Sequence, residues 1–129
     1  MKTQSNINRN KTFLRIIGDR AEDAVAQYLA DCGFRLIARN YNVPGIGELD
    51  LVFEKEQVLY IIEVKSRRND GPYPHSEEAV DFKKRKRIYR TAKRFMSERG
   101  YFGRDIEFLV GCVTHEPGGQ ISKIEVIPF

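Results

Sequence analysis

Two apolar segments near the middle of the chain carry charged residues that constrain the fold. The first reads Gly47-Glu48-Leu49-Asp50-Leu51-Val52-Phe53, and the second reads Val58-Leu59-Tyr60-Ile61-Ile62-Glu63-Val64-Lys65. Short apolar runs rich in β-branched residues predict buried β-strands. A carboxylate buried without a partner is very costly, so the acidic residues in these runs need a compensating group. The pattern therefore predicts two paired strands whose charged side chains meet.

Side-chain alternation predicts that these charges share one face of the sheet. Alternate residues of a strand point to the same face, so Glu48 and Asp50 share a face of the first strand, and Glu63 and Lys65 share a face of the second. Leu49, Leu51 and Phe53 would point to the other face. A register shift of one residue would move the two groups of charges to opposite faces.

The expected register follows from the hairpin loop, which we place at residues 54–57. Phe53 then lies opposite Val58, Asp50 opposite Ile61, and Glu48 opposite Glu63. In this arrangement Asp50 and Glu63 are diagonal neighbours, with Cβ atoms roughly 7–8 Å apart or less. Two carboxylates at that separation can share one divalent cation, and an ammonium beside them completes a set that suits metal-dependent phosphodiester hydrolysis. Oxygen ligands favour Mg²⁺ or Mn²⁺ over a structural zinc.

Length, composition and termini narrow the class of protein. The chain has 129 residues, of which 41% are hydrophobic, so we expect one folded domain over residues 15–129 behind a flexible polar tail at residues 1–14. No apolar run approaches the ~20 residues of a membrane span, and the polar N-terminus lacks the apolar stretch of a signal peptide. We therefore expect a cytoplasmic protein without a membrane partner. The sequence contains no GxSxG, Walker or GxGxxG motif, which disfavours the α/β-hydrolases, the P-loop NTPases and the Rossmann enzymes.

The cysteines and histidines do not form a metal-ligand spacing. Cys32 and Cys112 lie far apart in the sequence, as expected of small, partly buried residues in a reducing compartment. His75 and His115 are isolated, and we expect both in loops.

Positive charge is concentrated in one third of the chain. Residues 65–94 contain 11 Lys or Arg against 4 Asp or Glu, a local excess of seven, whereas the whole chain has a net charge of +4. Such a concentration suits a polyanion such as nucleic acid, although a charge run alone is usually a solvated helix face.

The remaining sequence predicts helices and strands around the two charged segments. We expect helices at residues 16–32 and 77–99, strands at residues 34–40, 106–113 and 121–127, and a loop at residues 69–76. Glu22 lies at the edge of the first helix's apolar stripe. Lys84 lies in the apolar stripe of the second helix, which also contains Val80, Ile88, Ala92, Phe95 and Met96. The order favours an α/β fold with a mixed central sheet of about five strands flanked by helices.

Several of these motifs, taken together and in order, resemble one known family. The residues are Gly18, Glu22, Ala26 and Tyr28-Leu29, then Gly47-Glu48-Leu49-Asp50-Leu51, then Ile62-Glu63-Val64-Lys65-Ser66-Arg67, followed by Ala79-Val80 and Lys84. This series, over roughly residues 15–129, is similar to the YraN family of small bacterial proteins. The resemblance implies the restriction-endonuclease-like fold, also called the PD-(D/E)XK group, and a similarity to archaeal Holliday-junction resolvases.

The resemblance also implies roles for individual residues. Asp50, Glu63 and the carbonyl of Val64 would bind Mg²⁺ or Mn²⁺. Lys65 would orient or deprotonate the attacking water, or stabilise the developing phosphorane charge. Glu22 would assist the metal site from its helix. Together with Lys65 and Glu22, Glu48 is the third candidate catalytic residue. The candidate nucleic-acid-binding residues are Arg67, Arg68, Lys83, Lys84, Arg87, Arg90 and Arg94.

Two positions depart from the pattern of that family. Many members carry Arg-Phe-Asp on the strand where this chain has Ile106-Glu107-Phe108-Leu109, and an arginine is common where this chain has Asn42. These differences concern substrate handling more than the metal site.

Three functional hypotheses follow. The first is a divalent-metal-dependent endonuclease that hydrolyses DNA, including structured or branched DNA. The second is a non-catalytic nucleic-acid-binding module that retains the nuclease fold. The third is an interaction protein whose basic helix binds an acidic partner. The sequence leaves open DNA against RNA, and a monomer against a homodimer.

Overall fold

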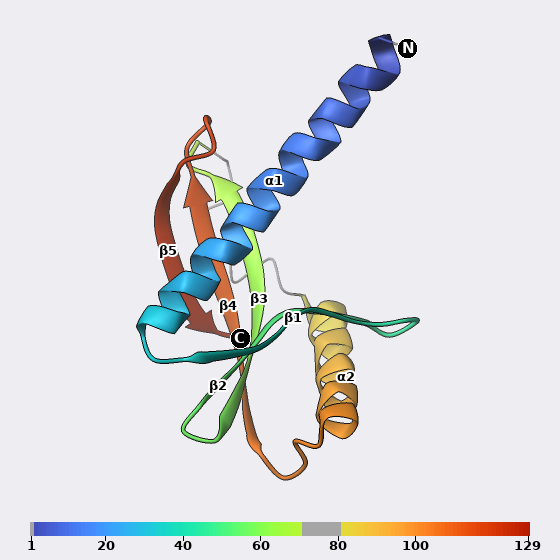
Figure 1. Cartoon of the computed structure of the whole chain (residues 1–129), viewed down its shortest axis with the longest axis vertical. Helices are drawn as coiled ribbons and strands as arrows, with labels where there is room; N and C mark the ends of the chain where they lie inside the picture. The colour runs from blue at the N-terminus through green and yellow to red at the C-terminus, as the bar shows by residue number, and fades with distance from the viewer. Residues whose placement is uncertain (1, 71–80) are drawn as a thin grey trace.

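The described part of the chain forms one mixed sheet with two helices. The structure is a computed structural model that describes residues 2–70 and 81–129, with side chains from Phe13 onward. The elements, in chain order, are α1 (Lys2–Asp31), β1 (Arg35–Val43), β2 (Gly47–Lys55), β3 (Val58–Arg68), α2 (Phe82–Arg99), β4 (Asp105–His115) and β5 (Ile121–Pro128) (Figure 1). The strands are hydrogen-bonded in the order β1-β2-β3-β4-β5. Only β3 and β4 run parallel; the other pairs are antiparallel. The expected α/β fold with a mixed five-stranded sheet is confirmed.

The parallel pairing explains where α2 lies. Parallel neighbours cannot be joined by a tight turn, and α2 falls in the crossover between β3 and β4. The helix packs on the face of the sheet that carries Ile61, in a cluster with Ile88 and Phe95. The next residue, Ile62, points to the opposite face and packs with Val25 of α1. Each helix therefore covers one face of the sheet.

The first helix is longer than the sequence pattern predicted. It begins at Lys2, so the chain is helical where we expected a polar tail. The segment from Lys2 to Ile17 contains no glycine or proline to stop the helix. Its N-terminal half extends beyond the strands (Figure 1), and Leu14 remains 69% exposed there. The helix ends before Gly33, whose φ of 91° is the left-handed conformation expected after a helix.

The second helix has clear caps at both ends. The Asp81 side chain accepts a hydrogen bond from the Lys84 backbone N–H, and Gly100 ends the helix with a φ of 75°. Its buried residues are Ile88, Thr91, Ala92 and Phe95, while Met96 is half-buried. Several predicted features lie outside the described residues. They are the predicted start of the second helix at residue 77, Val80, His75 and most of the predicted loop at residues 69–76.

The β2–β3 hairpin corrects our register. The turn consists of Glu56 and Gln57, whose φ angles are 52° and 67°, and Phe53 pairs with Tyr60 instead of Val58. Glu54 lies within the ladder, where it forms ion pairs with Arg35 and Arg104. These distant partners favour the longer strands. The error of two residues is even, so it does not exchange the faces of β3.

The outer strands lie close to their predicted positions. β1 starts one residue later and ends three residues later than expected, and β5 ends at Pro128. β4 continues to His115, which is therefore a buried strand residue and not a loop residue. Cys112 is buried in the same strand, whereas Cys32 is exposed. In the part of the chain that the structure describes, no helix combines the length and apolarity of a membrane span.

Candidate functional site: a carboxylate and lysine cluster at a split in the sheet

The β2 and β3 strands separate at Asp50. Their ladder ends at the pair Leu51 and Ile62, although its continuation would place Asp50 opposite Glu63. The backbone N–H of Val64 instead donates a hydrogen bond to Asp50 Oδ2, at 2.8 Å. The Asp50 carboxylate thus takes the place of the missing strand partner, because it accepts the hydrogen bond that the Val64 N–H would otherwise donate to the β2 backbone.

The regular alternation of β2 fails at this split. Leu51 packs with the α1 cluster, but Leu49, two residues earlier, packs with the α2 cluster. Our expectation that Leu49 and Leu51 share a face is therefore wrong. Asn40, next to the break on β1, has a φ of 52°, in the left-handed region that asparagine tolerates.

Gly47 explains why the start of β2 approaches α2 so closely. A Cβ atom at this position would lie 2.7 Å from Thr91 Oγ1 and 2.9 Å from Arg87 Cγ. The Thr91 hydroxyl is held in place because it donates a hydrogen bond to the Arg87 carbonyl, at 2.7 Å. The glycine of the Gly-Glu-Leu-Asp motif is therefore required for close packing of the strand against the helix.

The split and the helix enclose a polar pocket of about 250 Å³. It brings together five of the predicted site residues, which are Glu48, Asp50, Glu63, Lys84 and Arg87. The complete lining consists of Gly47, Glu48, Asp50, Glu63, Lys84, Arg87 and Ile88. Glu48 is exposed at the surface, whereas Glu63 is only 7% exposed.

Two lysines neutralise Glu63. The Nζ atom of Lys84 lies 2.7 Å from Glu63 Oε1, and the Nζ atom of Lys65 lies 3.9 Å from the same oxygen. Lys84 comes from α2 and Lys65 from β3, so the cluster depends on the packing of helix against sheet. The inward position of Lys84 in the helical pattern was the signal that anticipated this contact.

The pocket shifts the proton affinity of Asp50. Burial, followed by the negative charge of Glu63, raises the pKa of Asp50 from 3.8 to about 7, although the Val64 N–H acts in the opposite direction. The charge of Glu22 raises the same pKa further.

The two lysines titrate in opposite directions. Burial and the neighbouring Lys84 lower the pKa of Lys65. Burial acts to lower the pKa of Lys84. The hydrogen bond to Glu63, the interaction with Lys65 and the negative charges of Glu63 and Asp50 together outweigh burial, so the net pKa is raised. Lys65 therefore releases its proton more readily than an ordinary lysine, while Lys84 stays charged.

Glu22 approaches the cluster from α1, on the other side of the split. Its Oε1 atom is buried without a hydrogen-bond partner, and the Nε atom of Arg39 lies 3.4 Å away. Burial raises the pKa of Glu22, in part offset by the charge of Arg39. Arg39 also contacts Asp23, at 2.5 Å. We missed this arginine; its position on the predicted first strand, facing the first helix, was the available signal.

The predicted nucleic-acid-binding residues occupy two regions. Arg67 and Arg68 lie at the end of β3, where Arg68 pairs with Asp70. The other five, Lys83, Lys84, Arg87, Arg90 and Arg94, lie on α2. Lys83, Arg87 and Arg90 are exposed, and Arg94 pairs with Glu98.

The carboxylates of the cluster are oxygen donors, the ligand type that Mg²⁺ prefers. In residues 13–70 and 81–129, no group of three His, Cys, Asp or Glu side chains is close enough to hold a metal. The cluster offers two carboxylates, Asp50 and Glu63. The Val64 carbonyl stays a ligand that the family resemblance implies. Burial and the nearby negative charge of Glu63 raise the pKa of Asp50, and a bound cation would offset both effects.

The fold and the site define an α/β protein of restriction-endonuclease-like architecture with a carboxylate and lysine cluster at the split of its sheet. Residues 21–126 match the model of the family described as "Uncharacterised protein family UPF0102", and the chain belongs to this family. The resemblance to the YraN family is thereby confirmed, because the two names denote one family.

Relatives from distant bacteria align over most of their length. A UPF0102 protein of Moorella thermoacetica is 36% identical over 85% of this chain and 90% of the relative. A UPF0102 protein of Nocardia farcinica is 37% identical over 83% of this chain and 87% of the relative. The family match includes the C-terminal part of α1, all of α2 and the strands β2 and β3 that carry the cluster.

Proposed function

We propose that this protein is a divalent-metal-dependent endonuclease that hydrolyses phosphodiester bonds in DNA, with structured or branched DNA as its substrate. The observation that carries the proposal is the juxtaposition of Asp50 and Glu63 at the split, with two lysine ammonium groups within 4 Å of Glu63. A buried like-charge pair is costly unless a cation or a substrate makes use of it.

The residues of the cluster divide the chemistry between them. Asp50, Glu63 and the Val64 carbonyl would hold Mg²⁺ or Mn²⁺, which polarises the phosphate and lowers the pKa of a bound water. Lys65, whose pKa is lowered, is suited to accept a proton from the attacking water. Lys84 stays charged and is suited to stabilise the negative charge that develops on the phosphate.

The exposed cations beside the pocket supply a surface for the DNA backbone. Arg87 lines the pocket itself, and Lys83 and Arg90 continue along the exposed side of α2. Phosphate contacts from such residues position a duplex without reading its sequence. Glu22 would act as a positioning residue through Asp50.

The decisive experiment compares cleavage of branched, duplex and single-stranded DNA, and of RNA, in Mg²⁺, Mn²⁺ and EDTA. We expect metal-dependent cleavage that is strongest on a branched substrate and absent in EDTA. Asp50→Asn should abolish it, whereas Glu107→Gln, an exposed carboxylate on β4, should retain it. Cleavage that persists in Asp50→Asn would refute the assignment of the site.

One observation favours a non-catalytic nucleic-acid-binding module as the second candidate. Lys84 already neutralises Glu63 at 2.7 Å, so the cluster can also exist as a structural ion pair. A module of this kind would bind DNA equally well with metal or EDTA and would cleave none of the substrates. The same panel of substrates separates the two candidates.

A further inference from the structure

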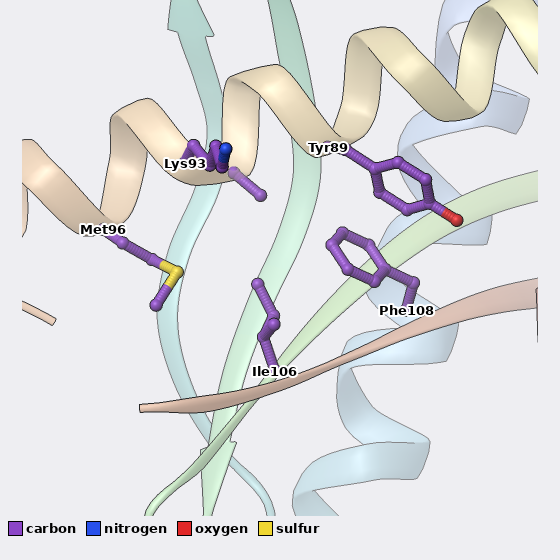
Figure 2. Close-up of a pocket in the computed structure, with 6 residues that line it drawn as sticks. Tyr89, Lys93, Met96, Ile106 and Phe108 are labelled. Atoms are coloured by element: carbon purple, nitrogen blue, oxygen red, sulfur yellow. The ribbon is translucent and has the colours of Figure 1, made fainter. Parts of the chain in front are cut away.

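A second cavity lies on the other flank of α2, between the helix and the start of β4. Its volume is about 330 Å³, and its lining consists of Tyr89, Ala92, Lys93, Met96, Ile106 and Phe108. Figure 2 shows the rings of Tyr89 and Phe108 at one end and the side chains of Met96 and Ile106 at the other. The proposed catalytic cluster uses none of these residues.

Aromatic rings form one wall of this cavity. The ring centroids of Tyr89 and Phe108 are 4.6 Å apart at an interplanar angle of 69°, and Phe129 lies 5.8 Å from Phe108. Tyr89 is 40% exposed, so its ring is accessible from solvent. A planar apolar group that enters the cavity would find ring surfaces to stack on.

The cavity lies within a positively charged surface. Lys93 is part of its lining, and the guanidinium of Arg85 lies 5.6 Å from the ring centre of Phe129. Glu98 is the single acidic residue in the sequence of α2, and it is paired with Arg94. A symmetric dimer formed through this surface would bring two cationic helices together, which opposes a second copy of the chain as the occupant. The surroundings therefore favour a ligand that is both anionic and aromatic.

We propose that this cavity binds an unpaired nucleobase from a single-stranded nucleic acid, while Lys93 contacts an adjacent phosphate. Single-stranded nucleic acid combines stacking bases with backbone charge, and proteins bind it with aromatic and basic side chains together. Lys93 lies nine residues after Lys84, which is about 13.5 Å along the helix axis and half a turn around it, so the two lysines project from opposite flanks of α2. A single strand that contacts both sites therefore has to cross the solvent-facing side of the helix, where Arg90 is exposed.

This inference deepens the proposed function, because it assigns a substrate with an unpaired stretch close to the cleaved bond. It rests on the nucleic-acid binding in that proposal, but not on cleavage. A base that is already unpaired, as at a branch point, enters such a cavity without the cost of unstacking a duplex.

The test measures binding in EDTA, by fluorescence anisotropy, for a single-stranded oligonucleotide and for its duplex. Tyr89→Leu removes the ring but keeps an apolar side chain, and Tyr89→Phe keeps the ring. We expect Tyr89→Leu to weaken single-strand binding by roughly 5- to 100-fold and duplex binding little. Tyr89→Phe should bind like the wild type. The matched control is Phe102→Leu, which removes a ring that is 73% exposed and outside the cavity.

A second measurement requires no change in the protein. The wild type is titrated with single strands that carry an abasic nucleotide at successive positions, and we expect one or two positions to weaken binding strongly. If Tyr89→Leu weakens single-strand and duplex binding equally, the inference is overturned. If Tyr89→Leu leaves single-strand binding unchanged, the inference is also overturned, and an apolar protein segment becomes the expected ligand of the cavity. A wild type that binds neither nucleic acid overturns this inference together with the substrate surface proposed above. Single-strand binding that depends on Tyr89, without any cleavage, supports the inference and refutes only the catalytic proposal.

Discussion

Replacing Asp50 with asparagine should change the pH dependence of stability in the metal-free protein. The pKa of Asp50 rises from 3.8 to about 7 on folding. Because the folded pKa is the higher one, the protonated form favours the folded state. The contribution is therefore fully present below about pH 4 and is lost as the pH rises through 7. At about 1.4 kcal/mol per pKa unit, the ionised carboxylate costs the folded state up to about 4 kcal/mol at pH 8.

The asparagine side chain in the Asp50→Asn variant is neutral at every pH, and its oxygen can still accept the hydrogen bond from Val64. We expect Asp50→Asn and the wild type to have similar free energies of unfolding near pH 4. At pH 8 the free energy of unfolding of the variant should exceed that of the wild type by about 2–4 kcal/mol. The range extends below about 4 kcal/mol because relaxation and water entry around the buried charge reduce its cost in the wild type. The gain should grow between these pH values.

Urea denaturation in EDTA at pH 4, 6 and 8, followed by circular dichroism, measures this difference. Glu107→Gln is the matched control, since Glu107 is exposed and belongs to neither cavity. A stability difference that is the same at all three pH values would refute our account of the cluster. So would an Asp50→Asn variant that is less stable than the wild type at pH 8.

Three further predictions follow from the same geometry. Mn²⁺ or Mg²⁺ should raise the thermal denaturation midpoint of the wild type, and Asp50→Asn should remove this shift; an unchanged response would show that Asp50 is not a ligand. Arg87→Glu should weaken binding to all nucleic-acid sequences alike and flatten the salt dependence of the binding constant by about one unit of slope. Lys84→Ala should reduce cleavage and leave binding nearly intact. If Lys84→Ala instead weakens binding and leaves cleavage unchanged, Lys84 is a phosphate contact. Gly47→Ala should destabilise the protein by about 1–3 kcal/mol in urea denaturation, because its Cβ would overlap the α2 side chains, whereas Gly118→Ala, with nothing within 4 Å, should not.

Local patterns in the sequence determined the elements and the general site. The apolar runs around Asp50 and Glu63 predicted both central strands, since burial and β-propensity act over a few residues. Gly33 and Gly100 marked the helix ends because only their left-handed conformation closes the last turn. The alternation rule placed Glu63 and Lys65 together because residues two apart on one strand share a face in any register. The register error of two residues still left Asp50 on the side of Glu63, because an even shift preserves the face.

Contacts between distant residues decided what the sequence could not. Arg35 and Arg104 hold Glu54 within the ladder, and no local pattern in the hairpin predicts partners so far along the chain. Gly47, at the start of β2, packs against Thr91 of a helix that begins more than 30 residues later, and no local pattern predicts this contact. The aromatic cavity likewise exists only because α2 and β4 come together. Residue types and spacing thus predicted which charges would meet, whereas the packing of α2 on the sheet decided where the strands separate and which surfaces remain open to a ligand.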